Sequence, residues 1–350
     1  MNLQRTIAHK ADIGNIIAMA LSFMIAIALP FHLFLFSYAV FGPLHYLTEL
    51  GWLDKKEYFI KSKGDFKYFV FFALFYTISV FIRSLPSMEF SKEWFQTLNP
   101  EGPVYSFLVW FKDIFKFITF SAFASAFIFM FVKSSFYRFI LVALSVVIGL
   151  KLVEHSAEAM LYFGLFVPTI IHVSIFTLLF MWFGSRKSNS TWGYVSCVLL
   201  VLLFLSCIVL PESILAISGT ISDKIVEIYK LSSFDFLNKR LAYVFGIFPQ
   251  VGDLDLTGIA GKKIQILIAF AYTYHYLNWF VKTRVIKWHE VPKKRLMTIG
   301  IIWIISIALY FYNYKVGLLA LLFLSMLHVF SEFPLNIITI KSLINFKPKN

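Results

Sequence analysis

The apolar stretch GYVSCVLLVLLFLSCIVL, from Gly193 to Leu210, decides the fold class of this chain. It contains no charged residue. A helix needs about 20 consecutive apolar residues to cross the hydrocarbon core of a bilayer, and a helix satisfies all of its own backbone hydrogen bonds there. We therefore predict a transmembrane helix over residues 193–217.

Similar stretches recur along the whole sequence. Of its 350 residues 59% are hydrophobic and 15% are charged, whereas soluble domains are about 45–50% apolar and about 25% charged. We predict an all-α fold, a polytopic bundle of about nine transmembrane helices that forms a single integral membrane domain over residues 1–350. The predicted spans are residues 13–37, 68–84, 117–133, 139–153, 158–184, 193–217, 264–281, 296–313 and 316–335.

The polar connections predict one or two helices at the membrane interface. Residues 105–116 mix aromatic and charged side chains, as interfacial helices do. The longest polar region, residues 218–262, lies between the sixth and seventh spans, and its part from Ile221 to Leu241 has helical periodicity. Residues 1–11 precede an apolar run without a cleavage signal, so we expect a first transmembrane helix and not a signal peptide.

The net charge of +13 points to membrane lipids as partners. The basic residues lie mainly in loops between apolar runs, where they suit anionic headgroups. The glycine, aromatic and basic interleaving of RNA-binding modules is missing, so we expect no nucleic acid. The short loops on the side of the C-terminus hold 18 of the 32 Lys and Arg residues. This bias predicts an outside N-terminus and a cytoplasmic C-terminus, and we expect a bacterial inner membrane.

Two similar hexapeptides carry the strongest chemical signal. Residues 44–49 and 327–332 both read Leu-His-x-x-(Ser/Thr)-Glu, so His45 precedes Glu49, and His328 precedes Glu332, by four residues. On a helix this spacing places both side chains on one face, one turn apart. An ionisable group among apolar residues is costly unless it is paired or hydrated, which makes these residues functional candidates.

We predict that histidines from several helices bind one metal ion. Imidazole and carboxylate ligands suit iron, manganese or zinc, and two isolated cysteines argue against copper(I) or iron–sulfur clusters. We expect Glu49 and Glu332 to act as catalytic proton acceptors or as ligands. Asn278 and Asn336 would orient the ligands through hydrogen bonds. The predicted metal ligands are His45, His172, His275 and His328.

Two other interpretations fit the same residues. Histidines at a membrane interface often only hydrogen bond to nearby carboxylates, and buried carboxyl and imidazole groups also carry protons or ions in transporters. A scaffold subunit, whose polar residues hold helices together, is a third possibility. The sequence has no phosphate-binding glycine loop, no Gly-x-Ser-x-Gly and no His-Glu-x-x-His. No two histidines lie within four residues of each other, as they do in the boxes of membrane desaturases.

The scattered histidines and the polytopic architecture resemble the bacterial carotene-cleaving membrane dioxygenases of the Brp/Blh type. In that family histidines on several helices hold one iron, and the matching set here is His45, His172, His275 and His328. The glutamates depart from an all-histidine site. The resemblance implies a metal-dependent membrane enzyme, possibly an oxidoreductase, that acts on a lipid, isoprenoid or hydrocarbon and takes its apolar substrate from the bilayer. The alternative is an ion- or proton-coupled transporter or channel.

Overall fold

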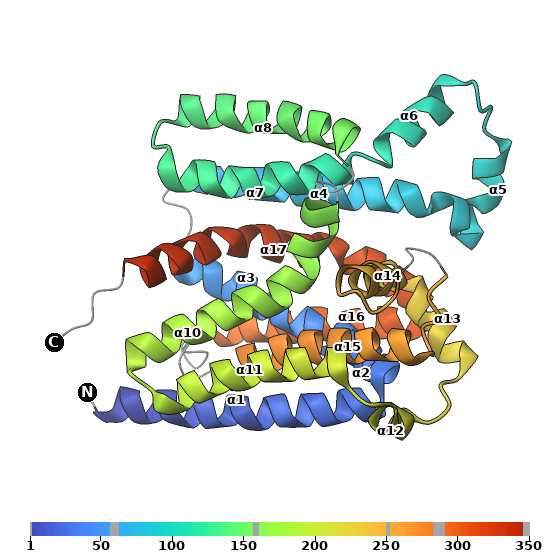
Figure 1. Cartoon of the computed structure of the whole chain (residues 1–350). Helices are drawn as coiled ribbons and strands as arrows, with labels where there is room; N and C mark the ends of the chain where they lie inside the picture. Colours follow the sequence, from blue (N-terminus) through green and yellow to red (C-terminus); the bar gives the residue numbers. More distant parts are fainter. Residues whose placement is uncertain (1, 57–62, 157–160, 250–252, 283–290, 346–350) are drawn as a thin grey trace. The chain divides into compact units, whose positions relative to one another are not determined.

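The computed structural model shows an all-α protein, as predicted (Figure 1). It describes residues 2–56, 63–156, 161–249, 253–282 and 291–345, and within these ranges there is no strand. The chain divides into two compact units, which are described separately. Unit 1 comprises residues 1–48, 170–318 and 339–350, and unit 2 comprises residues 49–169 and 319–338. The single membrane domain remains a prediction.

Unit 1 is built around α15 (Ile259–Val281), on which α1, α2, α11 and α14 pack. Its other elements follow the same order as the sequence. They are α1 (Asn2–Ala28), α2 (Pro30–Phe36), the π-helix η1 (Ser37–Phe41), α10 (Thr177–Ser188), α11 (Thr191–Val209), α12 (Glu212–Leu215), η4 (Ala216–Ser218), α13 (Asp223–Leu231), α14 (Asp235–Val244) and α16 (Lys293–Tyr312).

Unit 2 contains a helical layer in which α7 packs on both α4 and α8. Its elements are α4 (Lys63–Ser84), η2 (Leu85–Ser87), α5 (Glu89–Thr97), α6 (Pro103–Phe111), α7 (Phe115–Phe131) and α8 (Ser135–His155). Three helices contribute residues to both units: α3 (Gly42–Lys56), the π-helix η3 (Tyr162–Phe176) and α17 (Tyr314–Ile344).

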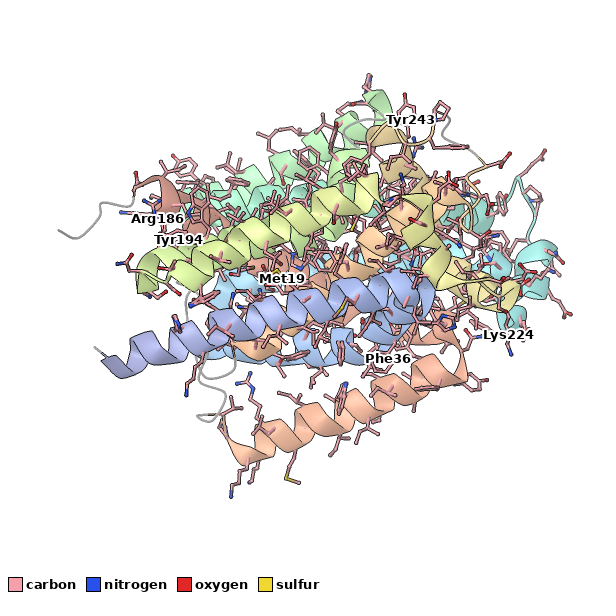
Figure 2. All side chains as sticks on the ribbon, turned by 60° about the horizontal axis from the view of Figure 1, so that its bottom comes forward. Met19, Phe36, Arg186, Tyr194, Lys224 and Tyr243 are labelled. Carbon is pink, nitrogen blue, oxygen red and sulfur yellow. The ribbon has the colours of Figure 1, made fainter. Side chains whose placement is uncertain are left out.

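The chain is a multi-pass integral membrane protein. Seven helices in its described part are long and apolar enough to cross a membrane, or eight if the bent pair α6–α7 counts as one span. Their side chains are apolar and exposed over much of their length. On α16, Met297 and Ile304 are 66% and 64% exposed, and Phe36 and Tyr194 point outward on α2 and α11 (Figure 2). Such surfaces suit a bilayer.

The predicted seventh span differs from the others. It corresponds to α15, which has an unbroken buried stretch from Ile264 to Tyr276 and falls outside the seven apolar candidates. Its polar and aromatic residues lower its hydropathy, and they are buried against other helices and not exposed to lipid. The count of about nine spans therefore includes one helix that forms the interior of unit 1.

The polar region after the sixth span forms two helices where we expected one. The chain turns at Ser233, which has a φ of 61°, so α13 and α14 form a helical hairpin. A buried chain of hydrogen bonds fixes this hairpin to α15. The Tyr229 hydroxyl donates to Asn238 Oδ1 (2.6 Å), Asn238 Nδ2 donates to Gln265 Oε1 (2.9 Å), and Gln265 Nε2 donates to the Pro30 carbonyl (3.2 Å).

Two helices that carry site residues begin with well-defined local signals. Pro43 lies in the first turn of α3, where its missing N–H costs nothing. Asn313 caps α17, because its side chain accepts from the backbone N–H groups of Lys315 (3.0 Å) and Val316 (3.2 Å). A Cβ on Gly317 would lie 2.7 Å from the Tyr310 side chain, so this tight turn requires glycine.

Candidate metal centre

His275 on α15 is the centre of a buried group of imidazoles in unit 1. Its Nε2 lies 3.1 Å from Nε2 of His45 on α3. Its ring lies 4.9 Å from the ring of His172, centroid to centroid. The three histidines are 7%, 2% and 3% exposed, respectively. The structure thus brings together three of the four predicted metal ligands, from segments more than 90 residues apart in the sequence.

Thr177 orients His275. The Thr177 Oγ1 and His275 Nδ1 atoms are 2.8 Å apart, so this hydrogen bond leaves Nε2 directed at His45. Metal-binding histidines are commonly oriented in this way through their second nitrogen. The sequence analysis missed Thr177 and assigned the role to Asn278, which is buried on α15 three residues after His275. Only the position of Thr177, five residues after His172, could have suggested it.

The π-helix η3 explains why His172 and Thr177 both contact His275. Residues five positions apart differ by about 140° around an α-helix. In a π-helix, where hydrogen bonds join residues i and i+5, they lie nearly above each other. η3 ends at Phe176, directly before Thr177, and contains Pro168. This local geometry places an imidazole and a hydroxyl on the same side of one segment.

Hydrogen bonds and ring contacts hold His45 in place on α3. Trp279 Nε1 donates to Thr48 Oγ1 (3.0 Å), which ties α3 to α15 one turn beyond His275. The rings of Tyr276 and Trp279 lie 5.3 and 5.7 Å from the His45 ring. Two chemical states account for the contact between His45 and His275: an N–H···N hydrogen bond, or two lone pairs directed at one cation.

The remaining predicted residues lie in unit 2. The carboxyl groups of Glu49 and Glu332 are hydrogen bonded to each other, and both side chains are at most 3% exposed. A nitrogen of His328 and a carboxylate oxygen of Glu332 lie within 4.8 Å of each other. His328 Nδ1 also lies 2.7 Å from the Ser325 carbonyl oxygen. Asn336, one turn after Glu332 on α17, is buried, and its orienting role remains a prediction.

Burial shifts the titration of the two site residues on α3, which lies outside the candidate spans. It lowers the pKa of His45 to about 3, so the imidazole is neutral at pH 7. Burial raises the pKa of Glu49 to about 8, although the hydrogen bond with Glu332 acts in the opposite direction. Protonated Glu49 supplies the O–H group that a hydrogen bond between two carboxyl groups requires.

The chain matches no protein-family model, no curated protein and no solved structure. The resemblance to Brp/Blh-type dioxygenases therefore remains a prediction.

Proposed function

We propose that this protein is a metal-dependent membrane enzyme that acts on an apolar lipid, isoprenoid or hydrocarbon, with dioxygen or water as the second reactant. The observation that supports this proposal is the contact between His45, His172 and His275. Three buried imidazoles from three segments, one of them oriented through its second nitrogen, form the donor set that iron, manganese and zinc prefer.

The distance between the two Nε2 atoms favours iron or manganese. With bonds of about 2.1 Å to a shared ion, a separation of 3.1 Å corresponds to a ligand–metal–ligand angle of about 95°. A tetrahedral zinc site would separate the two nitrogens by about 3.4 Å. An angle near 90° is typical of octahedral sites, which leave positions open for a substrate and a small reactant.

Each proposed residue has a role that follows from its chemistry. His45, His172 and His275 hold the ion, and Thr177 keeps the His275 ring in the orientation that directs Nε2 toward it. The ion would polarise or activate the second reactant. Glu49 follows His45 by one turn of α3, and with Glu332 it would accept and return protons. His328 as a further ligand remains a prediction.

Metal analysis tests this proposal. We expect close to one iron or manganese per chain by plasma mass spectrometry of detergent-purified protein, and at least a tenfold loss in His275→Ala. The matched control is His155→Ala, because His155 is exposed and binds the Lys151 carbonyl of its own helix. His328→Ala in the same series tests the additional ligand. Folded wild-type protein without metal would refute the enzyme.

The second candidate is a proton- or ion-coupled transporter, and the hydrogen-bonded pair of Glu49 and Glu332 favours it. Two carboxyl groups in contact hold one proton between them, as proton-binding sites in transporters do. Proton uptake by liposomes containing wild-type protein, absent in Glu332→Gln, would support this candidate. Metal-free protein that also moves no protons would leave the scaffold interpretation.

The orientation and the compartment belong to the same proposal. We place the protein in a bacterial inner membrane with its N-terminus outside and its C-terminus in the cytoplasm, on the basis of the basic short loops. A reporter fused after residue 350 that fluoresces only in the cytoplasm would be active in this topology. An inactive reporter on a normally inserted chain would reverse it.

A further inference from the structure

A cavity in unit 2 lies apart from the histidine and glutamate groups and does not depend on the proposed function. Its volume is about 500 Å³, within the range of about 300–1,000 Å³ that is typical of small-molecule sites. Three basic residues line it, together with one carboxylate and several apolar side chains. They include Arg83, Lys112, Lys116, Asp113, Ile82 and Leu108.

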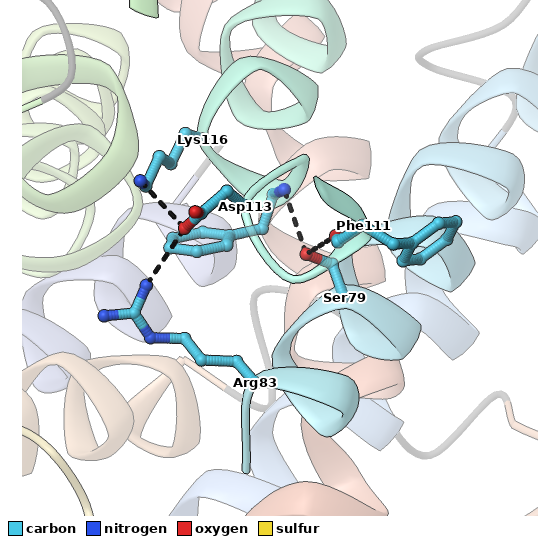
Figure 3. A network of polar contacts seen from close by, with 6 residues as sticks. Ser79, Arg83, Phe111, Asp113 and Lys116 are labelled. Carbon is cyan, nitrogen blue, oxygen red and sulfur yellow. Dashed lines mark hydrogen bonds and ion pairs between the residues drawn. The ribbon is translucent and has the colours of Figure 1, made fainter. Parts of the chain in front are cut away.

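Asp113 organises the basic side chains of this cavity (Figure 3). Its Oδ1 accepts from Arg83 Nη1 (3.3 Å) and from Lys116 Nζ (2.8 Å). Arg83 also lies over the Phe115 ring, with its guanidinium carbon 5.5 Å from the centroid. Lys112 completes the set, and the four charged groups sum to +2. The cavity therefore keeps an excess of positive charge after its internal ion pairs are counted.

The backbone around the cavity is held in a fixed bend. The axes of α6 and α7 differ by 44° at the break between them. Ser79 of α4 bridges this break, because its hydroxyl donates to the Phe111 carbonyl (2.9 Å) and accepts from the Phe115 N–H (3.1 Å) (Figure 3). The residues between these two, among them Lys112 and Asp113, are thereby positioned against the end of α4.

The cavity lies where apolar helices end. The candidate span of α4 closes at Ser87, just beyond Arg83, and the bent pair α6–α7 breaks at Lys112. Aromatic side chains on the neighbouring helices are exposed: Trp94 by 48% and Trp110 by 59%. Exposed tryptophans next to span ends are typical of the membrane–water interface. The cavity thus opens at the depth of the lipid headgroups.

We propose that this cavity binds an anionic phospholipid. Arg83, Lys112 and Lys116 would bind the phosphate, since guanidinium and ammonium groups are the usual phosphate donors. The apolar wall, including Ile82 and Leu108, would contact the glycerol backbone and the first acyl carbons. A soluble phosphate would use only the basic side of the cavity. The apolar side and the interfacial depth both favour the lipid.

Lipid titration by native mass spectrometry of the full-length protein tests this inference. Phosphatidylglycerol and phosphatidylcholine with identical acyl chains are compared. We expect the anionic lipid to bind more tightly, with about a fivefold loss in Lys112→Gln and about a 25-fold loss in Lys112→Glu. Lys151→Gln is the matched control, because it removes the same charge from an exposed lysine of α8 in the same unit.

Three outcomes would overturn the proposal. Equal binding of the two lipids would show that the cavity does not recognise the headgroup charge. Equal losses in Lys112→Gln and Lys151→Gln would show only a general effect of net charge. Displacement of the lipid by 10 mM inorganic phosphate would assign the cavity to a soluble anion. All variants are checked for monodisperse elution, and Arg83→Gln provides a second variant if Lys112→Glu aggregates.

Discussion

Removing the buried ion pair of unit 2 should strongly destabilise the protein. Arg138 Nη1 lies 2.6 Å from Asp65 Oδ2, and the two side chains are 10% and 8% exposed. Arg138 also donates through Nε to the Val132 carbonyl (2.7 Å) and through Nη2 to the Phe129 carbonyl (3.3 Å). One side chain of α8 therefore binds the first turn of α4 and the last carbonyls of α7.

The substitution Asp65→Asn removes the charge and keeps the shape. It leaves the Arg138 cation buried without its counter-ion, and breaking a buried pair in this way costs about 3–5 kcal/mol. At about 2–4 °C per kcal/mol, the melting temperature in detergent should fall by about 6–20 °C. Thermal unfolding followed by size-exclusion chromatography measures it. The double variant Asp65→Asn/Arg138→Gln should lose less than the sum of the two single losses.

The exposed pair Lys151–Glu154 is the control, with side chains 69% and 55% exposed. Surface ion pairs contribute little, so Glu154→Gln should leave the melting temperature unchanged. A loss in Asp65→Asn no larger than in Glu154→Gln would refute the reasoning. The pair would then be hydrated in the real membrane or detergent environment and would not hold the three helices together.

Three further predictions concern buried polar groups. The raised pKa of Glu49 contributes stability that is present below its usual pKa of 4.5 and lost as the pH rises through about 8. The melting temperature should therefore fall between pH 5 and pH 9, and fall less in Glu49→Gln; parallel curves would contradict this. Gln265→Leu should cost about 2–4 kcal/mol, because it leaves the Asn238 amide and the Pro30 carbonyl without their buried partners; chemical denaturation measures this, with Gln265→Glu as a comparison. Asn313→Ala should cost about 1 kcal/mol as α17 loses its N-cap, and Asn313→Ser should restore most of it.

The sequence was sufficient for the local features of this fold. Length and apolarity predicted the membrane class, and the spacing of His45 and Glu49, and of His328 and Glu332, correctly placed each pair on one helix. Residues 105–116 were read as a continuous interfacial helix. The structure breaks that segment between α6 and α7, because Ser79 binds backbone groups on both sides of the break.

Features that depend on distant partners could not be predicted. The chain bends at Leu29, with a φ of −136°, whereas Gly42 and Pro43 continue a helical path that we expected them to interrupt. The burial of α15 depends on helices from both sides of the sequence. The bond between Thr177 and His275 joins residues 98 positions apart, so neither residue type nor local spacing reveals it.

The π-helix before Thr177 makes the length of the chain itself part of the candidate metal centre. Deleting one residue between His172 and Thr177 would return the segment to ordinary helical winding and rotate one of the two side chains by about 100°. Every histidine would still be present, and the composition of the segment would hardly change. The His275 ring would nevertheless lose either its neighbouring imidazole or its hydroxyl partner. Insertions and deletions in Tyr162–Phe176 should therefore be tolerated far less than substitutions.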